Sequence, residues 1–384
     1  MTTTGHTRST LFLALLAALN ALSVAQAADV QLYGRVSTSL RMTNVEGGDT
    51  SVDMNNEGSR WGLNITETVS PDLSAKAYLE GGFNSDDGGF SNSGRSNLDT
   101  TLFDRHAVLA LHSKTYGELG FGRSGSVRSA VAPYGLILLP LDPVNGAYYD
   151  IVSISVMFGA DPRANNTVTY VSPRIRGWKT GISYSFATTD QELPDSRENN
   201  RLLSFGANYE GGPLGIYLGA SYARNGESDA ASADAGKKYA REDSQAYTIG
   251  MTYKPDETWK FYTALQYQSD YRNVAGWKLD RGAVADPLDR KHGIDGISAM
   301  VGFNYRMSNG LRGTMSYYYF EGDHTLADGT EESGKRQTVN AVLDYRLSKT
   351  FMLYGTVTYS KGGDVLDTAD CSKWVSRIGA MKFF

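Results

Sequence analysis

Two arginines near the start of the chain lie on the polar side of an alternating pattern. Arg35 has the opposite parity to the aliphatic residues of VQLYGRV, and Arg60 has the opposite parity to the apolar residues of RWGLNI. Because successive side chains of a strand point to opposite faces, both guanidinium groups lie on the face turned away from the apolar side chains. Asp142 and Asp150 are the acids that could oppose them. Guanidinium groups facing carboxylates across a narrow passage would set a transverse field that acts on ions, so the predicted chemistry is electrostatic.

Other kinds of chemistry have little support in the sequence. The five histidines share no metal-ligand spacing: His6, His106, His112, His292 and His324. No G-x-S-x-G nucleophile motif is present, and GFGRSG has the glycine spacing of a dinucleotide fingerprint without a βαβ unit after it. NSDDGG, at Asn84–Gly89, lacks the twelve-residue spacing of a calcium loop. We therefore predict no catalytic residue, no metal site and no cofactor.

The elements that would position the charges are strands. In FMLYGTVTYS, at Phe351–Ser360, apolar residues alternate with small or polar ones, and WKTGISYSFA repeats the pattern. The segments AYTIGMTY, ISAMVGFNY, TVNAVLDY and LLSFGANY behave alike. No helical stripe of comparable length occurs, and no window has the roughly 18 consecutive apolar residues of a membrane helix. The chain is therefore predicted to be all-β.

Connections of two kinds separate these strands. Tight turns are predicted where Pro, Gly, Asn, Asp or Ser gather, at residues 69–74, 172–177, 210–213, 254–257, 307–310 and 347–350. Long polar connections lie between them, as at Arg224–Asp243 and Glu321–Arg336. Alternation of short and long connections is typical of an up-and-down transmembrane barrel, and about sixteen strands can be counted. A soluble β-sandwich also alternates in polarity, but its loops would not segregate by length.

The start of the chain has the pattern of a targeting segment. Residues 1–27 contain a basic residue, a short apolar run and small residues before Ala28, as a cleaved secretory signal does. The barrel domain is then expected to span residues 28–384. A membrane anchor is the alternative, but the apolar run is too short to cross about 30 Å of hydrocarbon. The single cysteine, Cys371, cannot form an intramolecular disulfide in this exported chain.

The charge balance argues against a nucleic-acid partner. The chain has 37 Lys and Arg residues against 42 Asp and Glu residues, a formal net charge of −5. A phosphate backbone requires a basic face, and the sequence supplies no excess of positive charge. We therefore predict no nucleic-acid binding.

Aromatic residues recur at the ends of the strands. Five tyrosines lie one to three residues before a tight turn, on the apolar parity of their strands: Tyr170, Tyr209, Tyr253, Tyr305 and Tyr345. Membrane barrels carry aromatic girdles where lipid meets water, so these residues predict the girdle at the short-turn end. The last strand, Trp374–Phe384, runs the same way and ends without a turn. Phe384 is therefore predicted at a girdle position, on a closing strand paired with the first strand, Val30–Leu40. Lys382 shares its parity.

Several segments together resemble the general porins of Gram-negative outer membranes. They are VQLYGRV (Val30–Val36), SRWGLNITETVSPDLSAKAYLEGG (Ser59–Gly82), LFDRHAVLAL (Leu102–Leu111), YGELGFGR (Tyr116–Arg123), RANNTVTYVSP (Arg163–Pro173) and the terminal phenylalanine. The resemblance covers essentially the whole chain after the signal. It implies a 16-stranded antiparallel transmembrane β-barrel with an inward-folded third loop. It further implies a homotrimer in the cell outer membrane, among lipid and lipopolysaccharide, whose terminal Phe384 is read by the barrel-assembly machinery.

The third long connection is consistent with that resemblance. It runs from Ser124 to Asn165 and contains APYGLILLPLDPVNGAYYD, which is longer and more apolar than the other loops. Packing against an inner wall would explain the apolar run, and covering a contact between subunits is the alternative. Pro133, Pro140 and Pro143 are expected to exclude a regular helix there.

The resemblance also adds residues to the candidate site. Arg105 and Arg163 stand at positions that match the basic cluster of the porin constriction, beside Arg35 and Arg60. Asp142 and Asp150 are the acids of the third loop. Asn64 and its successor stand where porins commonly have a basic residue followed by glycine, which removes one lumen charge and leaves the preference for anions or cations open.

These observations predict a water-filled channel for passive diffusion of ions and small hydrophilic solutes, and no enzyme. A substrate-specific outer-membrane channel, which would carry a ladder of aromatic residues or arginines, is the alternative. A barrel enzyme would need His106 within reach of a serine and of an orienting polar partner.

Overall fold

A computed structural model of the chain describes residues 28–90, 101–144, 153–188, 199–225, 241–279 and 291–384. The predicted signal, residues 1–27, lies outside the described residues. The strands are β1 (Asp29–Val45), β2 (Thr50–Asn56), β3 (Arg60–Thr68), β4 (Leu73–Gly82), β5 (His106–Ser113), β6 (Gly117–Gly125), β7 (Arg163–Val171), β8 (Trp178–Ser185), β9 (Arg201–Gly211), β10 (Leu214–Arg224), β11 (Ser244–Tyr253), β12 (Trp259–Tyr271), β13 (Asn273–Val274), β14 (Trp277–Lys278), β15 (Ile294–Ser308), β16 (Leu311–Thr325), β17 (Glu331–Arg346), β18 (Phe351–Asp364) and β19 (Lys373–Phe383). Two single helical turns, α2 (Leu138–Leu141) and α3 (Ile154–Met157), accompany them.

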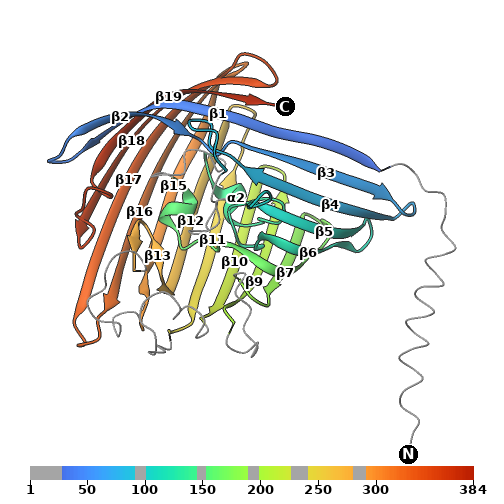
Figure 1. The fold of residues 1–384 in the computed structure, drawn as a ribbon, viewed down its shortest axis with the longest axis horizontal. Coiled ribbons are helices and arrows are strands. Elements are labelled where there is room, and N and C mark those ends of the chain that lie inside the picture. Colours follow the sequence, from blue (N-terminus) through green and yellow to red (C-terminus); the bar gives the residue numbers. More distant parts are fainter. Residues whose placement is uncertain (1–27, 91–100, 145–152, 189–198, 226–240, 280–290) are drawn as a thin grey trace, which may run out of the picture.

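The strands form one closed antiparallel barrel. Each wall strand pairs with its neighbours in sequence, and β1 also pairs with β19, which closes the ring (Figure 1). β2 and β3 both pair with β1, on either side of a break at residues 57–59, so they act as one wall strand. Among the described residues, the 17 strands of the main sheet therefore make 16 wall strands, as predicted. β13 and β14 form a separate small hairpin.

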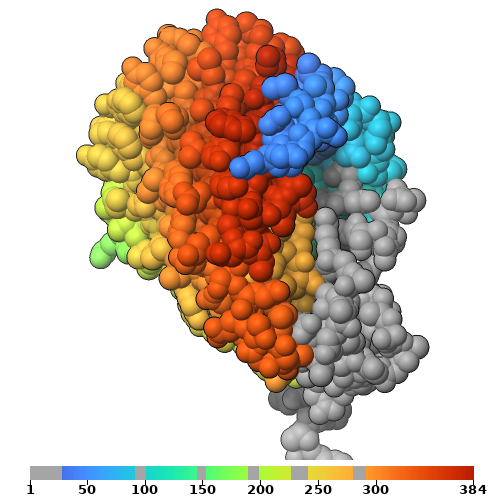
Figure 2. Space-filling view, turned by 90° about the vertical axis from the view of Figure 1, so that its left-hand side faces the viewer, coloured from blue at the N-terminus to red at the C-terminus, as the bar shows by residue number. Residues whose placement is uncertain are grey.

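The closing seam uses the last residue of the chain. Phe384 accepts a backbone hydrogen bond from Gly34 at 2.9 Å and donates one back to it at 3.1 Å. Figure 2 shows the residues of β1, in blue, directly beside the C-terminal strands, in red. Phe384 is half exposed at 50%, as expected of a girdle residue, and its pairing with the first strand is confirmed. Lys382 is exposed on the same face and donates to Thr350 at 2.7 Å.

The wall has an apolar outer face and a polar inner face. In β17, Val339 and Leu343 are 43% and 47% exposed, while Thr338 and Asn340, on either side of Val339, are fully buried. This alternation matches the period of a strand and places polar side chains toward the lumen. No helix in the described part of the chain is long and apolar enough to cross a membrane.

The aromatic residues of the short-turn end lie as predicted. Tyr170, Tyr253 and Tyr345 are 40%, 43% and 44% exposed on the outer face. Tyr209 and Tyr305 are partly covered, because Trp178 and Trp259 pack on them with ring centroids 5.4 and 4.4 Å apart. Tryptophan therefore adds to the girdle that the tyrosines predicted.

One predicted long loop is wrong over most of its length. In the segment Glu321–Arg336, β16 continues to Thr325 and β17 begins at Glu331, which leaves a turn of residues 326–330. Polar cross-strand pairs extend this hairpin, since Lys335 lies 3.1 Å from Glu321 and Ser333 donates to Asp323 at 2.7 Å. A polar composition indicated a loop, but these pairs stabilise strands in water as well. The other long connection, Arg224–Asp243, does separate β10 from β11.

Candidate functional site

Glu80 is the centre of the candidate site. It lies on β4 and faces the lumen, in register with Gly62 on β3 and His106 on β5. Its Oε1 lies 2.5 Å from Nε of Arg105, and its Oε2 lies 3.4 Å from Nε of Arg60. Glu80 is only 6% exposed, so the carboxylate is screened little and holds both guanidinium groups. The structure thus brings together two of the four predicted arginines.

A tyrosine and a histidine complete the surroundings of Glu80. Tyr33 donates its hydroxyl to Glu80 Oε2 at 3.1 Å, and that hydroxyl lies 3.3 Å from Nε2 of His106. Tyr33 reaches across β3 because Gly62 has no side chain; a Cβ there would lie 2.6 Å from the tyrosine ring. In the described part of the chain, the side chain of His106 contacts Tyr33 and Glu80 and no serine, so these residues do not support the barrel enzyme.

Arg163 lies beside a second arginine that the sequence analysis did not single out. Arg163 begins β7, opposite Gly125 of β6. Arg123 of β6 donates to the Arg163 carbonyl at 3.5 Å, to Asn165 Oδ1 at 2.8 Å and to the Asp104 carbonyl at 2.7 Å. Since Asp104 directly precedes Arg105, these bonds connect Arg163 to the group around Glu80.

Arg35 has a different environment. It faces inward, as its parity predicted, but is only 6% exposed. Its Nε donates to the Gly58 carbonyl at 3.0 Å and its Nη2 to the Glu57 carbonyl at 2.7 Å. These carbonyls lie in the break between β2 and β3, where they have no ladder partner. Arg35 therefore supports the interrupted wall strand. Among the described residues, no contact joins its guanidinium to Glu80.

The break also inserts a carboxylate that sequence reasoning missed. Glu57 is 2% exposed and its Oε1 lies 2.9 Å from Nε of Arg377, which is itself 2% exposed on β19. Asn55 and Ser39 donate to the same oxygen at 2.8 and 3.4 Å. The pair reaches from the interrupted strand across β1 to the closing strand. The sequence indicates this pair only through Arg377, a charged residue whose parity is opposite to that of the apolar Ile378.

The two predicted acids of the third loop are placed separately. Asp142 follows α2, is 2% exposed and accepts a hydrogen bond from the Val144 amide at 3.2 Å. It lines a cavity with Lys260 and Asn304, on the side of β12 and β15, and so is not beside Arg60 and Arg105. Asp150 lies outside the described residues. The single described acid in contact with Arg60 and Arg105 is therefore Glu80.

The apolar run of the third connection is buried within this chain. Ile137, Leu138 and Leu141 are fully buried, and α2 occupies one helical turn despite its proline, so the prolines limit the helix rather than exclude it. The backbone carbonyls of this connection are held by inward-facing side chains of the wall. Asn208 donates to Leu136 at 3.0 Å, Asn304 to Pro143 at 3.0 Å and Ser298 to Met157 at 2.8 Å. Packing on its own wall explains the apolar run without a subunit contact.

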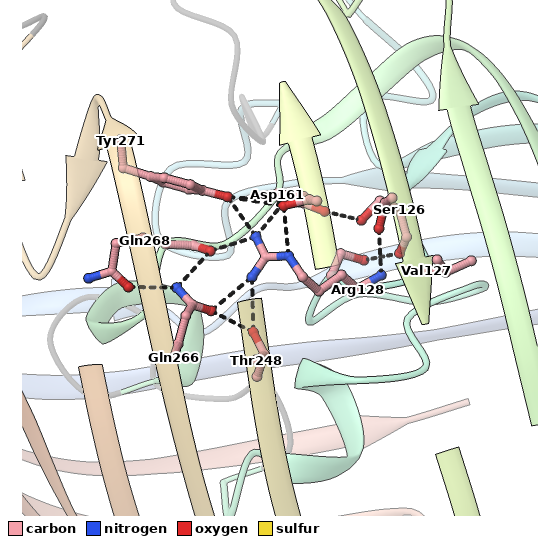
Figure 3. Close-up of polar contacts among 12 residues, drawn as sticks. Ser126, Val127, Arg128, Asp161, Thr248, Gln266, Gln268 and Tyr271 are labelled. Carbon is pink, nitrogen blue, oxygen red and sulfur yellow. Dashed lines mark hydrogen bonds and ion pairs between the residues drawn. The ribbon is translucent and has the colours of Figure 1, made fainter. Parts of the chain in front are cut away.

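A buried ion pair joins the two ends of the same connection (Figure 3). Arg128 is fully buried, and its Nη2 donates to Asp161, to the Gly159 carbonyl at 2.6 Å and to Tyr271 at 2.8 Å. Its other nitrogens donate to side chains of three consecutive strands: Ser221 at 2.9 Å, Thr248 at 3.4 Å and Gln266 at 2.8 Å. Burial alone would lower the pKa of Arg128, but the charge of Asp161 outweighs it and raises that pKa. The connection is thus fixed to the wall by a saturated guanidinium.

The inner face of the wall is also shaped to receive this connection. Gly206 and Gly219 lie against Ile137, with Cβ positions 3.1 Å from its side chain, and Gly250 lies against Leu141. A larger residue at these positions would displace the segment. In the sequence, this fit is indicated by glycines at lumen-facing positions of successive strands. The inward direction of Glu80 could also have been predicted, because Lys76, Tyr78 and Glu80 alternate with the apolar residues of AKAYLEGG.

The arrangement can act on charge but shows no metal-binding geometry. Among the described residues, no group of three or more His, Cys, Asp or Glu side chains could hold a metal ion. What the geometry provides is a row of guanidinium groups, fixed by Glu80 and by backbone carbonyls on the inner face of a barrel. Such a row attracts anions and repels cations that pass it.

Comparisons with known proteins agree with the barrel fold. A family profile described as Gram-negative porin matches residues 13–364. An outer membrane porin protein of Bordetella pertussis is 30% identical over 336 residues, which are 81% of this chain and 79% of that protein. The anion-selective porin from Comamonas acidovorans has a similar fold, with a TM-score of 0.68 at 22% identity over 93% of this chain and all of that one. The trimer form of OmpT from Vibrio cholerae gives a TM-score of 0.60 at 16% identity, over 94% of this chain and all of that one.

Proposed function

The chain belongs to the Gram-negative porin family, and from this premise we propose that Arg60, Arg105 and Arg163 form the charged wall at the narrowest part of its channel. The protein is an outer-membrane porin, whose barrel lets ions and small hydrophilic solutes diffuse passively. Proteins of this family and fold are channels rather than enzymes. The observation that carries the proposal is Glu80, which holds Arg60 and Arg105 at one place on the inner face.

In this proposal, the third connection folds into the lumen and forms the other side of the constriction. Its support is the set of contacts that residues 126–144 make with inward-facing side chains of the wall, together with the buried pair of Arg128 and Asp161. This segment packs on β6 through Tyr134 and on β8 through Val127, and it continues round the wall to Asn304 of β15. The cluster around Glu80 lies on β3 to β5, so we place the open passage beside these strands. The arginines line that side.

The charges around Glu80 favour anions. In the described part of the chain, Arg60, Arg105, Arg123 and Arg163 lie near two acids, Glu80 and Asp104. Asp142 and Asp150 were predicted as opposing carboxylates, and we keep this role for Asp150 as part of the proposal. We assign Arg35 a supporting role, because it donates to the carbonyls at the break behind the cluster.

The remaining partners are proposed from the family. The barrel would assemble as a homotrimer, surrounded by outer-membrane lipid and lipopolysaccharide, after residues 1–27 are removed as a signal. Phe384 would be read by the barrel-assembly machinery. The half-exposed ring of Phe384 at the end of the closing strand supports such a role, since a terminal strand presented before closure is accessible to a partner.

Single-channel recording tests the proposal. The protein, purified in detergent, is inserted into a planar bilayer under a salt gradient, and the conductance steps and reversal potential are recorded. Wild type is expected to give steps in groups of three and a reversal potential of the sign that anion preference produces. Arg60→Gln with Arg105→Gln is expected to move that potential toward cation preference.

The outer-facing variant Lys382→Gln is the matched control, because it removes one positive charge at the membrane surface rather than in the lumen. It is expected to leave the reversal potential unchanged. A protein that is folded, as shown by heat-modifiable gel mobility, but conducts no ions would contradict the channel. An unchanged reversal potential in the double arginine variant would contradict the constriction.

A further inference from the structure

A second group of cations lines the lumen at the opposite end from the long loops. Two neighbouring cavities of about 460 and 420 Å³ share Arg306 and Arg312 as lining residues. The first continues to Arg346 and the second to Lys260 and Lys254. Because the shared arginines border both, the two cavities form one groove, which we call the basic groove.

The groove lies on the inner face of the wall. Lys260 of β12 is in register with Asn304, which is buried and binds the third connection. Arg312 of β16 is in register with the buried Asp344, and Arg346 of β17 is in register with the buried Met352. Since side chains in register share a face, these cations point into the lumen. Arg312 and Arg346 lie beside the short turns that connect β15 to β16 and β17 to β18, and Lys260 lies beside the turn that connects β11 to β12.

Positive charge exceeds negative charge in the groove. Its lining residues include five cations and three acids, the acids being Asp142, Glu257 and Asp344. Asp344 pairs with Arg312 at 2.8 Å, and Glu257 lies 2.7 Å from Lys254 and 4.0 Å from Arg306. Asp142 is buried and accepts from the Val144 amide.

Two cations of the groove, Lys260 and Arg346, form no ion pair in the described part of the chain. Lys260 lies over the ring of Tyr262, with Nζ 4.6 Å from the centroid. Arg346 lies 6.0 Å from the centroid of Phe383. An aromatic face steadies a cation without neutralising it, so both charges remain available to a ligand. They stand at opposite ends of the groove, with Arg306 and Arg312 between them.

We propose that the basic groove binds small polycarboxylate anions, at a site separate from the cluster around Glu80. One carboxylate of such a ligand can bond Arg306 or Arg312, which border both cavities, while another bonds the cation at one end, Lys260 or Arg346. Guanidinium groups bind carboxylates with paired hydrogen bonds. A monovalent anion bonds one of these cations at a time and is held weakly. The groove therefore discriminates by the number of charges on the solute, next to the mouth of the channel.

The proposal is tested with citrate as the probe, on the full-length protein purified in detergent. Binding is measured by titration calorimetry on wild type and on Lys260→Gln with Arg346→Gln. We expect saturable binding to wild type and a dissociation constant at least about tenfold higher in the double variant, because two unneutralised cations are lost. Chloride and acetate are expected to compete poorly.

Two further variants keep the test decisive. Lys382→Gln removes a cation at the same end of the barrel but on the outer face, and is expected to leave the dissociation constant unchanged. Glu257→Gln removes an exposed acid of the groove, and is expected to lower the dissociation constant. Heat-modifiable mobility confirms that each variant is folded. No citrate binding to folded wild type, or equal affinities in wild type and the double variant, would overturn the proposal.

The groove proposal rests on the proposed channel function only because solutes reach the groove through the lumen. The two proposals can therefore fail separately. If Arg60→Gln with Arg105→Gln abolishes citrate binding while the groove variant keeps it, citrate binds at the constriction and the groove is refuted. If wild type binds citrate through the groove but conducts no ions, the constriction fails and the groove stands.

Discussion

The buried pair of Arg128 and Asp161 is predicted to set the dimensions of the channel. The perturbation is Arg128→Met, which keeps a long apolar side chain but removes every hydrogen bond of the guanidinium. Asp161 would remain buried, and it would still accept hydrogen bonds from Ser126 at 2.5 Å and Tyr271 at 3.3 Å. Removing one partner of a buried ion pair costs about 3–5 kcal/mol, because the other charge stays without compensation.

This loss of free energy weakens the docking of the third connection rather than the pairing of the wall strands. The pair joins residues 126–161 to β10, β11 and β12, whereas the strands keep their own backbone ladder. At about 1.4 kcal/mol per power of ten, docking would weaken by about a hundredfold to a few thousandfold. The expected result is a folded barrel whose single-channel conductance is higher or fluctuates, and whose segment 126–161 is cut faster by protease.

Two variants make this prediction refutable. Arg128→Met with Asp161→Leu is expected to recover part of the loss, since replacing both partners of a buried pair by apolar groups is often nearly neutral. Arg41→Met, in the more exposed pair of Arg41 and Asp53, is the control, and is expected to change stability by less than about 1 kcal/mol. The reasoning is refuted if Arg128→Met is folded and keeps the conductance, closure rate and protease resistance of wild type.

Three further predictions concern the wall and the fit of the loop. Arg377→Met removes the cation that pairs with the buried Glu57, and we expect the closing seam to lose about 3–5 kcal/mol of stability. The loss should lower the temperature of the heat-modifiable mobility change, and an unaltered temperature would contradict the prediction. Hydrogen bonds from Ser113 and Thr115 of the neighbouring turn lower the pKa of Asp72. The stabilising contribution of Asp72 is therefore complete above about pH 4 and is lost as the pH falls through its folded pKa. The difference in heat stability between wild type and Asp72→Asn should be present at neutral pH and vanish in acid. Gly250→Val places a side chain against Leu141 and should displace the third connection, with an altered conductance as the readout. In Gly363→Ala the added Cβ makes only an ordinary contact, 3.8 Å from Lys335, and this variant should conduct as wild type does.

Local pattern was sufficient for much of this fold. Alternation and turn composition predicted the strands, the barrel, and the exposure of Tyr170 and Tyr253, because these depend on residues a few positions apart. The inward direction of Arg35 and Arg60 followed for the same reason. The error at Glu321–Arg336 has the opposite cause, since polar residues there are held in strands by partners across the hairpin.

The partners of the charges could not be predicted in this way. Parity states which face Arg35 and Arg60 share, but not that one binds the carbonyls of a broken strand and the other binds Glu80. That difference depends on the break at residues 57–59, which is visible only when β1 is paired with both β2 and β3. Likewise, Arg128 meets residues more than ninety positions away, at Ser221, Thr248 and Gln266.

The sequence by itself thus determined the barrel, its two faces and the place of Phe384 at the end of the closing strand, because a strand repeats every two residues and its ends are marked by turns and aromatic residues. Tertiary structure alone decided which arginine meets which acid, where Asp142 lies, and which cations of the basic groove form no ion pair in the described residues. Closing the barrel brings distant strands to one lumen, and the distances between charges across that lumen follow from register and closure rather than from neighbours along the chain.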